Sequence, residues 1–196
     1  MAVHHRVGSA MKRTLDLLLA SLAALLLLLP AAGIALLIKL TSRGPVLYWS
    51  DRIGQNNRVF RMPKFRSMRL GTPAVATHLL ADPQTFLTPV GSFLRRSSLD
   101  ELPQLWSVLV GDMSLVGPRP ALYNQYDLIE LRTRRGVHDL LPGLTGWAQV
   151  NGRDELPIPV KVDYDVEYLR NQSVWLDLRI LCLTVARVVF REGVSH

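Results

Sequence analysis

Two adjacent carboxylates, Asp100 and Glu101, are the residues of this chain whose types and spacing best suit catalysis. They lie in the stretch SSLDELPQLW, directly before an apolar pattern typical of a helix. Because neighbouring residues on a helix do not face each other, the pair is not an ordinary stabilising contact. A carboxylate can attack phosphorus as a nucleophile, act as a general base, or coordinate a divalent ion. Asp100 and Glu101 are therefore the candidate catalytic and metal-binding residues.

Helix capping is the competing role for this pair. Ser98 and Glu101 fit the S-x-x-E capping box, in which each satisfies a free backbone N–H at a helix start. Pro103 argues against that role, because with Ser98 as the cap its missing N–H would fall beyond the first turn. A helix that begins at Asp100 or later places both carboxylates at its positive end, which also attracts phosphate. The spacing of these residues alone favours helix capping over catalysis, and both roles stay open.

Basic residues near the pair favour phosphate chemistry. Arg95 precedes the carboxylates, Arg119 is held between two prolines, and Lys64 lies in a segment rich in arginine and lysine. A guanidinium group binds phosphate with a planar fork of donors. Arg119, Arg95 and Lys64 are the candidate phosphate-binding residues of a phosphoryl-transfer site.

Short elements must position these side chains. Residues 44–69 predict two strands joined by a polar turn at 54–57. A helical stripe follows the acidic pair and ends near Gly111, and residues 166–190 predict a basic amphipathic helix. The stripe consists of Leu102, Leu105, Trp106 and Leu109. Since no repeat or linker interrupts residues 44–196, they are expected to form one domain.

The N-terminal region, residues 1–43, contains an apolar run over 17–38 without a charge. A bilayer crossing needs about 20 such residues, whereas the apolar part of a signal peptide has only about 7 to 15. Basic residues flank both ends: Lys12, Arg13, Lys39 and Arg43. Since basic flanks mark the cytoplasmic side and Pro30 interrupts the run, a re-entrant helical hairpin with Pro30 and Gly33 at its bend satisfies both signals. A kinked spanning helix is the alternative.

Composition limits the partners. The 196 residues are 48% hydrophobic and 20% charged, which excludes a disordered tail, and the net charge of +7 favours anionic partners. Phe60 and Phe65 interleave with the basic segment, but no nucleic-acid-binding motif accompanies them, so nucleic acid is not an expected partner. Cys182 is the single cysteine, which excludes an internal disulfide.

Three motifs in order, KFRSMR, SSLDELPQLWSVLVGDMSLVGPRP and LPGLTGWAQVNGR, resemble the bacterial sugar transferases, the monotopic polyprenyl-phosphate phosphoglycosyl transferases. The resemblance runs from about residue 12 to 190, and the length is similar to that of small members with a catalytic domain alone. It implies a mainly α fold with a small β-hairpin. It also implies an N-terminal re-entrant membrane helix-break-helix and interfacial amphipathic helices on the cytoplasmic face of the bacterial inner membrane.

The resemblance implies transfer of a phosphosugar from a UDP-sugar to undecaprenyl phosphate with release of UMP, the first membrane step of glycan assembly, as in exopolysaccharide synthesis. Asp100 matches the family's nucleophile, which forms a covalent phosphosugar intermediate, and Glu101 matches its partner, with Mg²⁺ required. Arg119 would hold substrate phosphate, with weaker support for Arg95 and Lys64. Anionic phospholipids are further expected partners, and downstream glycosyltransferases are compatible ones. One departure is Leu29, which stands where the family often has a serine before the bend proline.

A different class of function also fits the residues. In a membrane-anchored scaffold subunit of a glycan-assembly complex, the acidic pair would serve only as a helix cap. Substitution of Asp100 by asparagine would then leave activity unchanged.

Overall fold

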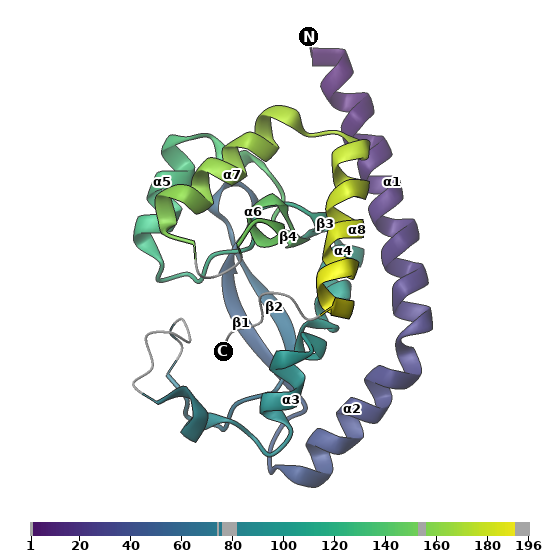
Figure 1. Cartoon of the computed structure of the whole chain (residues 1–196), viewed down its shortest axis with the longest axis vertical. Helices are drawn as coiled ribbons and strands as arrows, with labels where there is room; N and C mark the ends of the chain where they lie inside the picture. The colour runs from purple at the N-terminus through teal and green to yellow at the C-terminus, as the bar shows by residue number, and fades with distance from the viewer. Residues whose placement is uncertain (1, 74, 76–81, 153–155, 191–196) are drawn as a thin grey trace.

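The computed structural model describes residues 2–73, 75, 82–152 and 156–190 (Figure 1). It is mainly helical with one antiparallel β-hairpin, which confirms the predicted fold class at that level. The long N-terminal helix runs along one side of the molecule, beside the C-terminal helix, and the hairpin lies in the middle (Figure 1).

The N-terminal segment forms two helices, α1 (Ala2–Leu26) and α2 (Leu28–Thr41), bent by 58° at Leu27. The bend lies three residues before Pro30, because a proline ring collides with the carbonyl four residues earlier, here that of Leu26. Pro30 itself sits in the first turn of α2, where its missing N–H has no partner to lose. Gly33, predicted at the bend, lies inside α2 instead.

In the described part of the chain, neither arm of this pair alone has the length and apolar character to cross a membrane. The two arms together meet that requirement by length and composition.

The predicted hairpin is formed by β1 (Leu47–Ile53) and β2 (Val59–Phe65), with the short 3₁₀ turn η1 (Gln55–Asn57) between them. Asn56 and Asn57 have positive φ angles, a backbone conformation that asparagine tolerates better than most residues. Cross-strand pairing sets Tyr48 opposite Lys64. Paired residues share a face of the sheet, so the register decides which side of the hairpin carries Lys64.

Short helices follow the hairpin: η3 (Pro83–Phe86), α3 (Gly91–Arg96), η4 (Leu99–Glu101) and α4 (Gln104–Val110). Helix α4 ends at Gly111, as predicted, with φ at +100°. The predicted apolar stripe is wrong at Trp106, which is 59% exposed, whereas Gln104 and Ser107 are buried. Packing of α4 against α1 and β2 selects a face that simple hydrophobic periodicity did not identify.

A second, parallel pair of strands, β3 (Ser114–Val116) and β4 (Gly143–Thr145), was not predicted. Between them lie α5 (Tyr126–Arg134) and η5 (Val137–Asp139), and α6 (Trp147–Val150) follows β4. The backbones approach so closely that a Cβ on Gly143 would lie 2.1 Å from the amide nitrogen of Gly117. Glycine is therefore required at this crossing.

The predicted C-terminal helix over 166–190 is two helices, α7 (Ile158–Asn171) and α8 (Val174–Phe190). Ser173 begins α8, where its Oγ accepts a hydrogen bond from the amide of Leu176 at 3.2 Å. Serine is more favourable as the cap of a new helix than inside a continuous one, which explains the break between α7 and α8. Trp175 is 79% exposed, so part of the apolar side of α8 faces outward.

The main core joins both ends of the chain. Its buried members include Ala20 of α1, Met62 of β2, Val108 of α4 and Ile180 of α8. Helix α1 is thus part of the folded body rather than a separate appendage.

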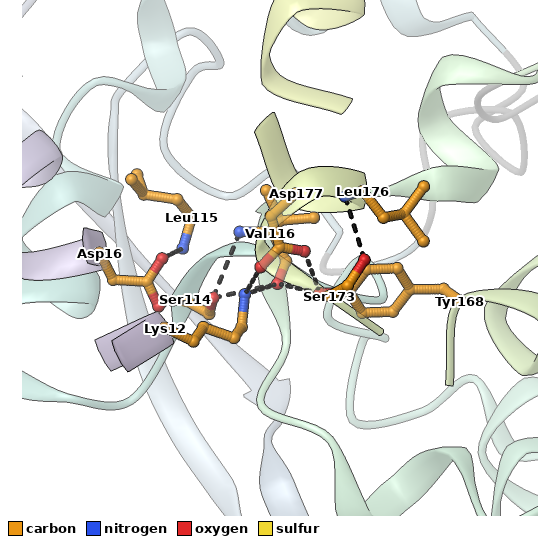
Figure 2. A network of polar contacts seen from close by, with 9 residues as sticks. All are labelled: Lys12, Asp16, Ser114, Leu115, Val116, Tyr168, Ser173, Leu176 and Asp177. Carbon is orange, nitrogen blue, oxygen red and sulfur yellow. Dashed lines mark hydrogen bonds and ion pairs between the residues drawn. The ribbon is translucent and has the colours of Figure 1, made fainter. Parts of the chain in front are cut away.

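A buried polar network reinforces this junction (Figure 2). Lys12 donates hydrogen bonds to Asp177 at 2.7 Å and to the Val116 carbonyl at 3.0 Å. The Tyr168 hydroxyl donates to Asp177 at 2.6 Å, and burial together with the Asp177 charge raises the pKa of Tyr168. Asp16 accepts hydrogen bonds from the Ser114 hydroxyl at 2.8 Å and the Leu115 amide at 3.1 Å.

Arg13 makes another contact between α1 and the body. Its guanidinium donates to the carbonyls of Val108 at 2.7 Å and Leu109 at 3.0 Å, at the C-terminal end of α4. A cation at that end of a helix is favourable for the helix dipole. Lys12 and Arg13, the basic residues before the apolar run, therefore both donate hydrogen bonds to the rest of the fold.

Candidate active site

The structure brings together residues predicted from three separate segments. Lys64 comes from β2, Glu101 from η4, and Arg119 from the segment after β3. Glu101 Oε1 accepts a hydrogen bond from Lys64 Nζ at 2.8 Å and from Arg119 Nη2 at 2.8 Å. Glu101 Oε2 lies 3.4 Å from Arg119 Nη1. One carboxylate is thus held between two cations.

The adjacent carboxylate is placed differently. Asp100 is 9% exposed, and within the described residues its side chain makes no hydrogen bond. Lys64, Glu101, Arg95 and Arg119 all act on it electrostatically. Asp100 therefore retains oxygen lone pairs that are available to a ligand.

Capping does not explain the pair. Ser98 has a φ of +56° and makes no side-chain capping bond, so the predicted capping box is absent. Glu101 contacts Lys64 and Arg119 across the fold instead of the backbone at Ser98. Helix α4 begins only after Pro103, which stands at its N-cap position. The carboxylates precede this helix in a separate 3₁₀ turn.

Burial and charge separate the titration of the two carboxyls. Burial raises the pKa of Asp100 to about 6, with Lys64 opposing this shift and Glu101 adding to it. Burial also works against ionisation of Glu101, but Arg119 and Lys64 outweigh it and hold the pKa of Glu101 well below its usual range. At neutral pH Glu101 is a fixed charge, whereas Asp100 is the more basic of the two carboxylates.

The two remaining predicted cations differ in their surroundings. Burial lowers the pKa of Lys64, while Glu101 opposes that shift. Arg95 acts on Asp100 through its charge, and its Nη1 lies 3.5 Å from the Met68 sulfur. Arg95 thus belongs to the electrostatic environment of Asp100 without being a contact of Glu101.

The backbone that carries Arg119 is held at three successive carbonyls. The Arg119 carbonyl accepts a hydrogen bond from Arg132 at 2.7 Å, and that of Pro120 accepts one from Arg52 at 3.1 Å. The Ala121 carbonyl accepts a hydrogen bond from the amide of Ile53 at 2.9 Å. This bonding fixes the main chain from which the Arg119 side chain reaches Glu101.

Arg132, which holds the Arg119 backbone, and its partner Asp165 were not predicted from the sequence. Asp165 Oδ2 accepts from Arg132 Nε at 2.9 Å and from Arg132 Nη2 at 2.7 Å, and both side chains are buried. Burial raises the pKa of Asp165, against the effect of Arg132. The two residues lie on α5 and α7, and no local motif links them. Arg52 was visible only as a member of the basic segment.

The residues present fit a Mg²⁺ ion held jointly with a substrate. Among the described residues there is no cluster of three or more acidic, histidine or cysteine side chains suited to a metal. Mg²⁺ commonly binds one or two carboxylates and completes its shell with substrate phosphates and water. Asp100 offers the open oxygens, and Glu101 stands beside it.

Comparison with known proteins identifies relatives. The family model described as "Bacterial sugar transferase" matches residues 7–191. The chain is 44% identical over 190 residues to the UDP-glucose:undecaprenyl-phosphate glucose-1-phosphate transferase of Escherichia coli K12, covering 91% of this chain and 40% of that protein. An enzyme of the same name from Xanthomonas campestris is 47% identical over 80% of this chain and 34% of its own length.

A shorter relative is matched over most of its length. The uncharacterized sugar transferase EpsL of Bacillus subtilis is 43% identical over 160 residues, which is 81% of this chain and 77% of that protein. By contrast, this chain spans about 40% or less of the length of the two glucose-phosphate transferases.

Proposed function

Because this chain belongs to the bacterial sugar transferase family, we propose that it transfers a sugar 1-phosphate from a UDP-sugar to undecaprenyl phosphate and releases UMP. Relatives named as UDP-glucose and UDP-N-acetylgalactosamine transferases to undecaprenyl phosphate support this reaction class. The observation that carries the proposal is the division between the carboxylates: Glu101 is bound by two cations, and Asp100 keeps open oxygens.

Asp100 is the nucleophile of the first step. One of its oxygens attacks the phosphorus that bears the sugar, and the bond from this phosphorus to the UMP oxygen breaks. UMP leaves with the bonding electrons, and an acyl phosphate joins Asp100 to the sugar. A carboxylate with a pKa of about 6 is largely ionised at pH 7 and more basic than an ordinary aspartate, which suits this attack.

The second step regenerates the enzyme. An oxygen of the polyprenyl phosphate attacks the same phosphorus, and the Asp100 carboxylate leaves. Two displacements thus replace one direct transfer between two anionic substrates.

Glu101, Lys64 and Arg119 supply the electrostatic setting. Arg119 has a planar fork that fits phosphate, and its backbone is held at three carbonyls. A donor fixed in advance loses less freedom when substrate binds. Glu101 keeps Lys64 and Arg119 beside the nucleophile and offsets their mutual repulsion.

The proposal includes Mg²⁺, which Asp100 and Glu101 would hold together with the substrate. When bound, the ion would neutralise charge on the diphosphate. The donor set described above supports this assignment, and depletion with a chelator followed by metal readdition tests it.

The location proposed for this reaction is the cytoplasmic face of the inner membrane, with the bent α1–α2 pair re-entrant and both its ends on that face. The bend of 58° and the apolar composition support this topology. Single cysteines at positions 8 and 45, in a Cys182→Ser background, should react with an impermeant thiol reagent only after cells are opened. Reaction at one position in intact cells would contradict the re-entrant topology.

A UMP-release screen tests the function directly. The full chain is incubated with undecaprenyl phosphate, Mg²⁺ and a panel of UDP-sugars. In a second arm without acceptor, labelled UMP should exchange into the reactive UDP-sugar, because the first step is complete before the acceptor binds. Release of UMP only when both substrates are present would replace the covalent intermediate with direct transfer. Absence of UMP release by the full chain with every UDP-sugar would favour the scaffold alternative, and unchanged UMP release by Asp100→Asn would exclude Asp100 as the nucleophile.

A further inference from the structure

Three arginines line a cavity that contains none of the catalytic residues described above. The cavity has a volume of about 340 Å³ and lies where α2 ends, beside the segment after β2. Its lining consists of Thr41, Ser42, Arg43, Arg66, Arg69, Leu70, Thr88 and Pro89. This lining contains three guanidinium groups and no carboxylate, so the wall of the cavity is positively charged.

Arg66 is built into the wall of this cavity. It is 4% exposed, and its Nη1 donates to the Arg43 carbonyl at 2.5 Å. Its Nη2 donates to the Ser42 carbonyl at 3.0 Å and the Ser42 hydroxyl at 2.7 Å. These bonds place a buried cation at the negative end of the α2 dipole. The helix end therefore does not repel an anion as a bare C-terminus would.

Gly44 provides the space for this guanidinium. Its φ is +116°, and a Cβ at this position would lie 2.3 Å from Nη1 of Arg66. The positive φ favours glycine, and a side chain at this position would have to displace the Arg66 guanidinium. The position of Arg66 is thus fixed by the main chain that follows α2.

The two other arginines have donors to spare. Arg43 and Arg69 are exposed. Among the described contacts, Arg69 uses only Nε, toward the Leu87 carbonyl at 3.3 Å, and the Arg43 guanidinium makes no hydrogen bond or ion pair. Like charges around a cavity repel one another, and a bound anion with several oxygens would relieve that repulsion.

The cavity adjoins the end of α2 and the end of the strand that carries Lys64. Leu37 and Leu40 are exposed in the last turns of α2, directly before Thr41. On the other side, Arg66 follows Lys64 by two residues, and its amide continues the ladder to the Val46 carbonyl at 2.9 Å. Two residues of extended chain span about 7 Å, so the backbone that carries Arg66 lies about that far from the backbone of Lys64, which binds Glu101.

We propose that this cavity binds the phosphate group of a membrane lipid. Three arginines suit a phosphate, and the adjoining exposed leucines suit acyl or prenyl chains. The ligand is either the polyprenyl phosphate acceptor, in which case the assignment rests on the proposed function, or an anionic phospholipid. Both present the same chemistry, a phosphate at the end of an apolar chain.

Lipid binding to the purified full chain in a neutral detergent tests this site. Native mass spectrometry counts the bound lipid and yields an apparent Kd for three probes: undecaprenyl phosphate, phosphatidylglycerol, and undecaprenol, which lacks the phosphate. The test variant is Arg43→Gln with Arg69→Gln, since both side chains are exposed. We expect its Kd for phosphate-bearing lipid to rise about 25-fold, about fivefold for each arginine, with no change for undecaprenol.

Two further variants make the result specific. Arg58→Gln with Arg134→Gln removes the same charge from exposed positions outside the cavity, and should leave all three affinities unchanged. Gly44→Ala displaces Arg66 without removing any charge, and should weaken phosphate-lipid binding. Thermal denaturation confirms that each variant is folded.

The pattern of losses identifies the ligand. A loss confined to undecaprenyl phosphate assigns the cavity to the acceptor, a loss confined to phosphatidylglycerol assigns it to phospholipid, and a loss of both assigns it to lipid phosphate in general. Unchanged binding in Arg43→Gln/Arg69→Gln, or an equal loss in the Arg58/Arg134 control, overturns the proposal. Since binding needs no turnover, failure of UMP release with intact arginine-dependent binding would refute the proposed function and leave the site standing.

Discussion

Substitution of Glu101 by glutamine separates the contributions of the two adjacent carboxyls. In the wild-type protein, burial raises the pKa of Asp100 to about 6, Lys64 lowers it and the charge of Glu101 raises it. Glutamine removes that negative charge while keeping the shape of the side chain. It also leaves Lys64 and Arg119 without their shared partner, so both cations act more strongly on Asp100. The pKa of Asp100 should therefore fall.

The expected size follows from these contacts. With a pKa of about 6, half of the Asp100 carboxyls are ionised at pH 6 and about a tenth at pH 5. Removal of a like charge from the neighbouring residue should lower the midpoint by about one pH unit. At pH 5 the variant should then have about half of its own plateau rate for the first step, compared with about a tenth for the wild-type protein.

The assay is exchange of labelled UMP into UDP-sugar, without lipid acceptor, between pH 5 and 8. It reports only the step in which Asp100 attacks, so a role of Glu101 toward the acceptor does not affect it. Because the variant's plateau rate will also change, each profile is normalised to its own maximum. The ¹³C shift of the labelled Asp100 carboxyl gives the same midpoint without turnover. Glu130→Gln, at an exposed residue whose ion pair is with Arg134, is the matched control.

If the acidic side of the pH–rate profile of Glu101→Gln stays where it is in the wild-type protein, or moves to higher pH, this reasoning is refuted. It would mean that the Glu101 charge does not raise the pKa of Asp100, or that another group limits the rate at low pH. A shift of the same size in Glu130→Gln would show that overall charge, rather than the adjacent carboxylate, sets the midpoint.

Three other substitutions have defined outcomes. Asp100→Asn should abolish UMP exchange. It should also raise the free energy of unfolding at pH 7.5 by up to about 3 kcal/mol. The reason is that the pKa of Asp100 is higher in the folded protein than in the unfolded chain, so the wild-type protein loses stability as the pH rises through about 6. Thermal melts should show this gain disappearing below about pH 4, and a gain that persists there would contradict the reasoning. Arg119→Lys keeps the charge but loses the planar fork, so turnover should fall about 100-fold with little change in melting temperature; near wild-type turnover would show that Arg119 is structural. Lys12→Met leaves Asp177 buried without its cation and should cost about 3 kcal/mol or more in chemical denaturation, and a loss below about 1 kcal/mol would show that the pair contributes little.

Local signals predicted the elements that carry the site. Two strand-like segments and the polar turn between them predicted the hairpin, and glycine predicted the end of α4. Residue chemistry predicted that Lys64, Glu101 and Arg119 belong together, although they are far apart in the chain. A carboxylate that attacks phosphate needs cations to offset the repulsion between the two anions, so the side-chain types alone were informative.

Contacts made only by tertiary packing were not predictable. The strands β3 and β4 have three residues each, too few to show any periodicity. The Arg132–Asp165 pair joins two helices that have no shared motif. Trp106 fits an apolar stripe by spacing, yet the buried face of α4 is chosen by its neighbours. The sequence also gave no sign that Lys12 is enclosed by the fold rather than marking a flank of the apolar run.

The polar contacts of Asp16 make α1 a spacer of defined length. Leu26, where α1 ends, is ten positions after Asp16, which corresponds to about 15 Å of helix. Inserting one residue there would turn α2 by about 100° and shift it by about 1.5 Å relative to Asp100, because Asp16 stays bound to β3. An insertion of seven residues, close to two full turns, would restore the direction of α2 but displace it by about 10 Å. In this part of α1, variation in length should therefore be tolerated far less than variation in side chain.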